Sequence, residues 1–297
     1  MRMSKFIGSL VGLAIGDSLG AAWEGYFKPG EVQDISSRYT DDTAMMIGVA
    51  ESLIACKGFN GQDMTERFIT NYEKEPWRGY GSGPPRIFRM MKQGAKWSEE
   101  LDKQIFPGGS YGNGAAMRIA PIGLFYAHSP EELRRVAYEA SRITHSHPLA
   151  LEGAALEAYA VALALQEEEN FLEKLIAFTR EEIYRKKLED CQRLLPWKAN
   201  RKEIIRILGN GIEAFNSVPT AIFSFLAQST FADSLIYAVS LGGDTDTIAA
   251  MCGAIAGAKY GLEGIPEKWL IDLENRDYIE KLAKDLLATW MDRLSTS

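Results

Sequence analysis

Two short acidic stretches hold the residues of this sequence that are best suited to chemistry. Thr40, Asp41 and Asp42 lie in YTDDTAMM, and Asp244 and Asp246 lie much later in LGGDTDTIAAM. Each stretch opens a run with helical periodicity, where first-turn aspartates interact favourably with the helix dipole by roughly 0.3–1 kcal/mol each. For either stretch taken alone, an ordinary helix start is the simpler interpretation.

The surroundings of the two stretches favour a shared binding site. The run after Asp246, TIAAMCGAIAGAKYG, has almost no charge, so we expect the start of this helix to be buried. Buried carboxylates are costly unless a cation lies close by. Yet the four residues that follow each acidic stretch include no Lys, Arg or His. Hydroxyl groups adjoin the carboxylates instead, on Thr40, Thr43, Thr245 and Thr247. Such hard oxygen donors suit Mg²⁺ or Mn²⁺, and two clusters together could hold a pair of ions for hydrolysis.

A glycine-rich stretch, GGSYGNG, supplies a second type of binding element. Gly108, Gly109, Gly112 and Gly114 would let the backbone approach a ligand closely, and its exposed amides could hold a diphosphate. A helix expected to begin near Ala115 or Ala116 would add its positive end, and Tyr111 could stack on a base. A plain glycine-rich turn is the alternative interpretation.

Helical patterns dominate the elements that must position these residues. Helices are expected over 41–56, 130–138 with Ser129 as the N-cap, 149–165, 171–195, 202–208, 218–227, 231–240, 245–260 and 278–293. Irregular segments are expected over 25–38, 73–85 and 103–114, whereas alternating strand patterns of any length and low-complexity linkers are missing. The sequence therefore predicts an all-α protein with a single domain over residues 1–297.

The first residues predict a buried helix. Gly8, Gly12 and Gly16 recur every four residues and would form a smooth face against a neighbouring helix. The same stretch has the rough outline of a signal peptide, but its apolar run is too short to span a bilayer and Asp17 and Glu24 follow directly. We therefore favour the core helix.

Composition narrows the class of protein. The chain has 297 residues, a net charge of −7 and a pI near 5.2, which disfavours nucleic acid and anionic membranes as partners. The three cysteines are widely spaced, without a CxxC pair, and this argues against disulfides or a zinc site. We expect a cytoplasmic protein that acts as a monomer.

Five stretches together carry a family resemblance, and they occur in order along nearly the whole chain. They are GLAIGDSLGAAWE (12–24), YTDDTAMM (39–46), GGSYGNGAAMRIAPIG (108–123), RITHSHPLALEGA (142–154) and SLGGDTDTIAAMCGAIAGAKYG (240–261). Each is weak alone, but in this order the chain resembles the ADP-ribosylglycohydrolase family. The resemblance implies that family's orthogonal bundle of α-helices.

The resemblance also implies roles for individual residues. Two Mg²⁺ or Mn²⁺ ions would be held by Glu24, Thr40, Asp41, Asp42, Asp244, Asp246 and Thr247. Glu24, Asp41 and Asp246 would act in catalysis. Substrate would be bound by Gly108, Gly109, Ser110, Tyr111, Gly112, Asn113, Gly114 and His145. Phe106 is a further candidate for stacking on the adenine, and Arg118 could reach a phosphate or pair structurally.

The implied activity is hydrolysis of the glycosidic bond of ADP-ribosylated substrates, which releases ADP-ribose. The partner would be an ADP-ribosylated protein or a small ADP-ribose derivative; the linkage stays open between arginine, serine, O-acyl and nucleic-acid adducts. The loops over 25–38 and 73–92 are expected to discriminate between them. Two alternatives remain: a nucleotide-sugar transferase that uses the Asp244–Thr245–Asp246 triplet, and a non-enzymatic, crystallin-like or ADP-ribose-binding relative.

Overall fold

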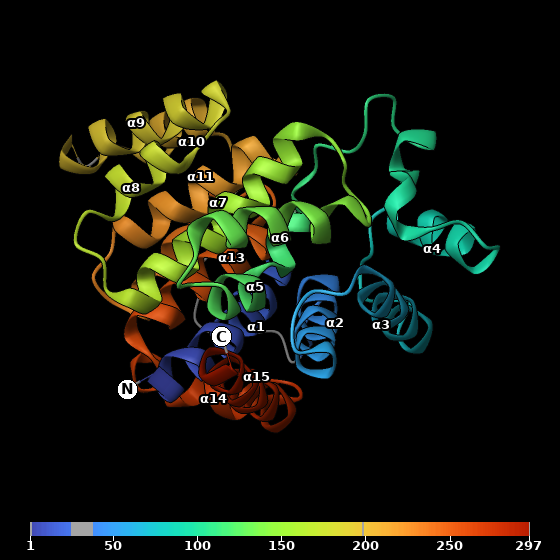
Figure 1. Ribbon diagram of the computed structural model, residues 1–297. Helices are drawn as coiled ribbons and strands as arrows, with labels where there is room; N and C mark the ends of the chain where they lie inside the picture. The colour runs from blue at the N-terminus through green and yellow to red at the C-terminus, as the bar shows by residue number, and fades with distance from the viewer. Residues whose placement is uncertain (1, 25–37, 198, 297) are drawn as a thin grey trace.

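A computed structural model describes residues 2–24, 38–197 and 199–296, and this part of the chain contains helices and no β-strand. The expected all-α class is confirmed (Figure 1). The α-helices are α1 (Arg2–Ala21), α2 (Asp41–Cys56), α3 (Gly61–Lys74), α4 (Pro84–Lys92), α5 (Ala120–Phe125), α6 (Pro130–Arg142), α7 (Pro148–Gln166), α8 (Phe171–Phe178), α9 (Glu182–Trp197), α10 (Arg201–Leu208), α11 (Ala214–Leu226), α12 (Phe231–Ser240), α13 (Thr245–Tyr260), α14 (Glu267–Asp272) and α15 (Arg276–Thr296). The 3₁₀ helices are η1 (Trp97–Glu99), η2 (Leu101–Gln104), η3 (Asn113–Arg118) and η4 (Leu262–Gly264).

The antiparallel pair α1 and α13 forms the centre of the core. A Cβ atom built on Gly8 would lie 2.5 Å from the carbonyl oxygen of Gly257, and one on Gly16 would lie 2.0 Å from that of Ala249. Any larger side chain at these positions would therefore force the two backbones apart. The Ser9 hydroxyl also donates a hydrogen bond to the Ala254 carbonyl at 3.0 Å. The glycine spacing thus predicted a real helix contact, which brings the end of α1 to the start of α13.

Helix α7 crosses the core beside this pair. It packs against α5, α6, α11 and α13. It is the one helix in the described residues that is long and apolar enough to cross a membrane, but 83% of its apolar window is buried inside the fold. Its apolar composition is therefore explained by its central position.

The single helix expected over 171–195 is wrong, because α8 and α9 are separate helices. Buried Glu152 and Arg134 form an ion pair at 2.9 Å and hold the connecting backbone. Glu152 accepts a hydrogen bond from the Arg180 amide at 2.6 Å, and Arg134 donates one to the Phe178 carbonyl. These tertiary bonds replace the helical bonds that would have joined the two segments.

Other boundaries differ from the sequence-based expectation more modestly. Helix α11 begins at Ala214, one turn earlier than expected, and α3, α4 and α14 were not expected as helices. Ser129 does occupy the N-cap position of α6, but in the described residues its side chain makes no capping hydrogen bond. Thr40 caps α2 as expected, by accepting a hydrogen bond from the Asp42 amide.

Candidate functional site

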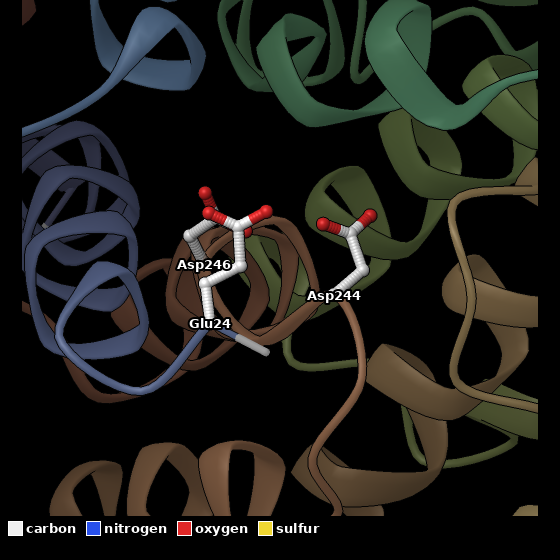
Figure 2. Close-up of side chains that lie close together, drawn as sticks. All are labelled: Glu24, Asp244 and Asp246. Atoms are coloured by element: carbon white, nitrogen blue, oxygen red, sulfur yellow. The ribbon is translucent and has the colours of Figure 1, made fainter. Parts of the chain in front are cut away.

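The contact between α1 and α13 places three carboxylates together. Glu24 follows α1, Asp244 is the N-cap of α13 and Asp246 lies in the first turn of α13. One carboxylate oxygen from each of the three lies within 4.8 Å of the other two (Figure 2). The hydrogen bond from the Thr245 hydroxyl to the Gly20 carbonyl, at 2.9 Å, holds the two helix ends in this register.

Asp17 connects the first acidic stretch to this group, and its role was missed from the sequence. Its side chain is fully buried in α1 and accepts hydrogen bonds from the Thr40 amide at 3.0 Å and the Thr43 hydroxyl at 2.6 Å. The Thr43 amide donates a further bond at 3.1 Å. Asp17 therefore binds the start of α2 directly. A lone aspartate in an otherwise apolar helix was the signal that could have identified it.

The start of α2 is also fixed from its other side. The Asp41 amide donates to the Arg78 carbonyl at 2.8 Å, and the Arg78 guanidinium binds the Tyr39 carbonyl at 2.7 Å and both carboxylate oxygens of Glu274 at 3.0 Å. Arg78 thereby links the loop after α3, the first acidic stretch and the segment before α15. The orientation of Asp41 and Asp42 therefore depends on residues that are distant in the sequence.

Burial and mutual repulsion act on all of these carboxyl groups. Burial, with the charge of Asp246, raises the pKa of Asp17 to about 7. Burial also raises the pKa of Asp41 to about 8, with contributions from the charges of Asp17 and Asp246. The pKa of Asp42 rises well above its usual value for the same reasons. The two acidic stretches therefore lie in one electrostatic environment.

The pKa values of the three carboxyl groups beside the start of α13 are also raised. Burial and the charge of Asp244 raise the pKa of Asp246 to about 7. The charge of Asp246, followed by burial, raises the pKa of the more exposed Glu24. Burial raises the pKa of Asp244, although a hydrogen bond from Asn113 opposes the shift. A bound divalent cation would reverse this repulsion.

The donor set fits such a cation. The Oδ1 atom of Asp42 is buried and has no hydrogen-bond partner among the residues described, so it is free to accept a ligand bond. Asp42 and Asp246 are 2% and 7% exposed, and Thr247 is also buried. All these atoms are hard oxygen donors, which Mg²⁺ and Mn²⁺ prefer. Asp41 and Asp42 lie outside the group of three carboxylates, at the start of α2.

Asp102 holds the glycine-rich loop in place. It is the second site residue that the sequence analysis did not identify. Asp102 is fully buried in η2, and its Oδ2 atom accepts hydrogen bonds from the amides of Ser110 and Ser146, both at 2.8 Å. Gly109 lies directly above, since a Cβ atom there would be 2.5 Å from the Ser146 hydroxyl. Asp102 thus joins the loop to the segment that carries His145.

The other side of the loop pairs with the segment before α11. The Asn113 amide donates to the Ile212 carbonyl at 2.9 Å, and the Ala214 amide donates to the Tyr111 carbonyl at 3.0 Å. The Asn113 side chain donates to Asp244, so the loop contacts the carboxylate group directly. Tyr111 is 50% exposed, and its ring lies beside those of His147 and Phe215, with centroids 5.6 Å and 6.1 Å away.

His145 lies under the loop and is 7% exposed. A Cβ atom on Gly114 would be 2.8 Å from its ring, and its Nδ1 atom lies 2.8 Å from the Thr144 hydroxyl. Burial and the charge of Arg118 lower the pKa of His145 to about 3, so its ring is neutral. His145 therefore lies against the loop, and its expected contact with the substrate stays a prediction.

One sequence-based expectation about the loop is wrong, and the contacts of Arg118 favour one of its two alternatives, structural pairing. The residues near Ala115 form the 3₁₀ helix η3 and not the start of an α-helix, so no full helix dipole points at the loop. Arg118 is 1% exposed and donates to the Gly114 carbonyl at 2.9 Å and the Thr144 hydroxyl at 2.8 Å. Its role is therefore structural, and its guanidinium is already used inside the protein.

Comparisons with known proteins agree with this geometry. The sequence model of ADP-ribosylglycohydrolase matches residues 1–294. The chain belongs to the ADP-ribosylglycohydrolase family. It is 38% identical to ADP-ribosylhydrolase ARH3 of Bos taurus, over 96% of this chain and 92% of that protein. It is 28% identical to the ADP-ribosyl-[dinitrogen reductase] glycohydrolase of Rhodospirillum rubrum, over 96% of both chains.

The fold of this family is also present in solved structures. A chain of an ADP-ribosylglycohydrolase-related protein complex matches with a TM-score of 0.77 and 30% identity, over 97% of this chain and 99% of that chain. The recognition of an ADP-ribosylglycohydrolase from the five ordered stretches is thus confirmed. Residues 25–37, most of one loop expected to discriminate between acceptors, lie outside the described residues.

Proposed function

We propose that this protein hydrolyses the glycosidic bond between ADP-ribose and an acceptor, and releases free ADP-ribose. The observation that carries the proposal is the group of Glu24, Asp244 and Asp246, joined through Asp17 of α1 to the start of α2, beside a glycine-rich loop that bonds to Asp244. The relatives named ADP-ribosylhydrolase and ADP-ribosyl-[dinitrogen reductase] glycohydrolase support the same reaction class. A crystallin-like, non-enzymatic role is disfavoured because every expected ligand position holds an oxygen donor.

Two Mg²⁺ or Mn²⁺ ions would be held by the carboxylates of Asp41, Asp42, Asp244 and Asp246 with the hydroxyls of Thr40 and Thr247, and Glu24 at the open side. When bound, they would supply Lewis acidity and neutralise charge that develops as the glycosidic bond breaks. The hydrogen bonds from Thr40 and Thr43 to Asp17 fix the α2 donors before any ion binds.

Glu24 is the residue best placed to move a proton. It is exposed to solvent at the edge of the carboxylate group, so it can exchange a proton with water. The Asp246 carboxylate accepts a hydrogen bond from the Thr247 amide at 2.8 Å, which fixes its orientation. We therefore assign the proton transfer to Glu24 and an anchoring role to Asp246.

The glycine-rich loop would orient the rest of the substrate. The amides of Gly109, Ser110, Gly112 and Asn113 are already bonded within the protein, so binding of the diphosphate falls to the remaining amides of the loop. Gly112 leaves room for close approach, and the exposed ring of Tyr111 offers a face for the adenine. Binding at this remote end places the reacting C1″ carbon at the carboxylates.

The acceptor, the compartment and the assembly belong to the same proposal. We favour an ADP-ribosylated protein or a small ADP-ribose derivative as the substrate and a single-domain monomer in the cytoplasm; the family match over residues 1–294 supports the single domain. Free Cys56, Cys191 and Cys252 are compatible with a reducing compartment.

Release of free ADP-ribose tests the proposal most directly. Purified protein is incubated with arginine-, serine-, O-acyl- and nucleic-acid-linked ADP-ribose, with Mg²⁺, with Mn²⁺ and with EDTA. We expect release that requires a divalent cation and that Asp246→Asn abolishes. If no substrate in the panel is cleaved, or if EDTA has no effect, the proposed reaction or its metal dependence is wrong.

A further inference from the structure

A hollow between α9 and α10 is separate from the site described above. Figure 1 shows these two helices at one edge of the fold, far from α3 and α4. The hollow has a volume of about 410 Å³, which lies within the range of small-molecule sites, roughly 300–1,000 Å³. Residues 182–208 contain eight basic and four acidic residues, whereas the chain as a whole has a net charge of −7. The hollow therefore lies in a locally positive part of an acidic protein.

Three basic side chains line this hollow, and two of them are available to a ligand. Arg193 forms an ion pair with Asp190 of the same helix at 2.7 Å. Lys186 and Arg206 are exposed, and neither forms an ion pair within residues 2–24, 38–197 and 199–296. Lys186 belongs to α9 and Arg206 to α10, so an anion between the helices could bind both. Ammonium and guanidinium groups are common protein ligands of phosphate.

The remaining side chains of the hollow limit which anion fits. Leu194 and Ile207, one from each helix, give it an apolar side. Glu203 adds a carboxylate that forms no ion pair in the described part of the chain and would repel a ligand with many negative charges. The same carboxylate can accept a hydrogen bond from a hydroxyl group of a ligand. The combination fits a phosphate monoester with an organic body better than a bare or polyvalent anion.

The chain leads directly from α10 to the acidic site. Helix α10 ends at Leu208, and the Asn210 carbonyl just after it accepts the Asp244 amide at 2.9 Å. Two residues further, the Ile212 carbonyl accepts the amide of Asn113 in the glycine-rich loop, also at 2.9 Å. The short segment after α10 therefore holds both Asp244 and the loop, and the position of α10 bears on both.

We propose that the hollow between α9 and α10 binds a small phosphate monoester, and that the bound ligand favours ADP-ribose binding through residues 209–213. The phosphate would bind Lys186 and Arg206 and hold α10 against α9, and the organic part would cover Leu194 and Ile207. A fixed α10 restricts the segment after it to the arrangement that bonds to the loop and the acidic site. The effect on ADP-ribose rests on the proposed function, whereas binding in the hollow does not.

Hydrogen exchange followed by mass spectrometry locates the ligand. Full-length protein with Mg²⁺ is compared with and without phenyl phosphate, and with and without inorganic phosphate. The variant is Lys186→Gln/Arg206→Gln, and thermal unfolding confirms that it folds. The control is Arg135→Gln/Lys281→Gln, because both residues are well exposed on α6 and α15 and the charge change is the same.

We expect phenyl phosphate to protect residues 186–207 in the wild-type and control proteins, and the hollow variant to need about tenfold more ligand for the same protection. Inorganic phosphate should bind about threefold or more weakly, because it leaves the apolar side uncovered. Glu203→Gln removes a like charge and should strengthen binding of both probes. In calorimetry with Mg²⁺, phenyl phosphate should raise ADP-ribose affinity about fivefold in the wild-type and control proteins and leave it unchanged in the hollow variant.

Absence of protection over residues 186–207 would overturn the inference, and equal protection in the hollow variant would indicate an adventitious ion only. Protection without a change in ADP-ribose affinity would refute the link through residues 209–213. An equal fall in ADP-ribose affinity in the wild-type protein and the hollow variant would indicate competition at the glycine-rich loop, and would refute the same link. If the wild-type protein binds no ADP-ribose while residues 186–207 are protected, the phosphate site stands and the proposed hydrolase function fails.

Discussion

Removing the carboxylate of Asp102 should uncouple the glycine-rich loop from the segment that carries His145. Asp102 is fully buried, and its Oδ2 atom accepts the amides of Ser110 and Ser146, each at 2.8 Å. In Asp102→Ala both amides lose their acceptor at a site that excludes water. The loop can recover this loss only by moving toward solvent, away from the position in which it faces the carboxylates.

The size of the effect follows from these two bonds. A hydrogen bond to a charged group contributes roughly 1.5–3 kcal/mol, so the alanine variant forgoes about 3–6 kcal/mol of local stabilisation. If a loss of about 2 kcal/mol is transmitted to ligand binding, the affinity for ADP-ribose falls roughly thirtyfold. Asp102→Asn retains one acceptor oxygen without the charge, so it should restore a large part of the affinity.

Isothermal titration with ADP-ribose at saturating Mg²⁺ measures this effect, and thermal unfolding measures the stability of each variant. Glu152→Gln is the matched control, since Glu152 is a fully buried carboxylate that also accepts a backbone amide, that of Arg180, between α8 and α9. We expect the control to lower the melting temperature and leave ADP-ribose affinity unchanged. Unchanged affinity in Asp102→Ala, with a similar loss of melting temperature, would refute the role of Asp102 in holding the loop.

Further predictions concern the metal site and the loop. Because burial and repulsion raise the pKa values of Asp17 and Asp246 to about 7 and of Asp41 to about 8, the metal-free native protein binds more protons than the unfolded chain between about pH 4 and pH 8. In EDTA the melting temperature should therefore fall as the pH rises through this window, and Mg²⁺ should remove the fall; a flat profile in EDTA contradicts the shared acidic site. Gly109→Ala should destabilise the fold, because its φ is +92° and its new Cβ atom would clash with Ser146, whereas Gly112→Val should mainly weaken ADP-ribose binding in calorimetry. Tyr111→Ala should reduce that affinity by about 1–3 kcal/mol if the ring stacks on adenine, and intact binding would exclude stacking. Glu24→Gln should keep ADP-ribose and at least one ion bound while turnover drops roughly 10²-fold; near-normal turnover would exclude proton transfer by Glu24.

Local patterns in the sequence determined much of the helical framework. Helix α2 begins and ends where the periodicity after Thr40 predicted, and α12 and α13 also match their expected bounds. These elements are specified locally, by N-caps, by apolar spacing and by the glycines before α13. The glycine spacing in α1 also predicted a tertiary contact, because a helix face without side chains lets the backbone of another helix pack closely against it.

The two acidic stretches were also recognisable without coordinates, because carboxylates beside hydroxyls and without cations are chemically unusual at a buried helix start. The sequence did not show where the two stretches come together in the fold. That position depends on Asp17, which binds the amides of α2 from α1, and on Arg78, which binds Tyr39 and Glu274 across the fold. The local sequence around Asp17 and Arg78 does not predict which residues they bind.

Only the tertiary structure showed which single buried side chains bind backbone amides that are distant in the sequence. Asp102 binds amides eight and forty-four residues away, and Glu152 interrupts the expected helix over 171–195 by binding the amide of Arg180. Helical periodicity reports bonds between residues three or four apart, so it carries no information on such bonds. A buried carboxylate bonds to whichever unpaired amides the packed helices bring to it, and the packing of the whole chain therefore fixes the loop and the site.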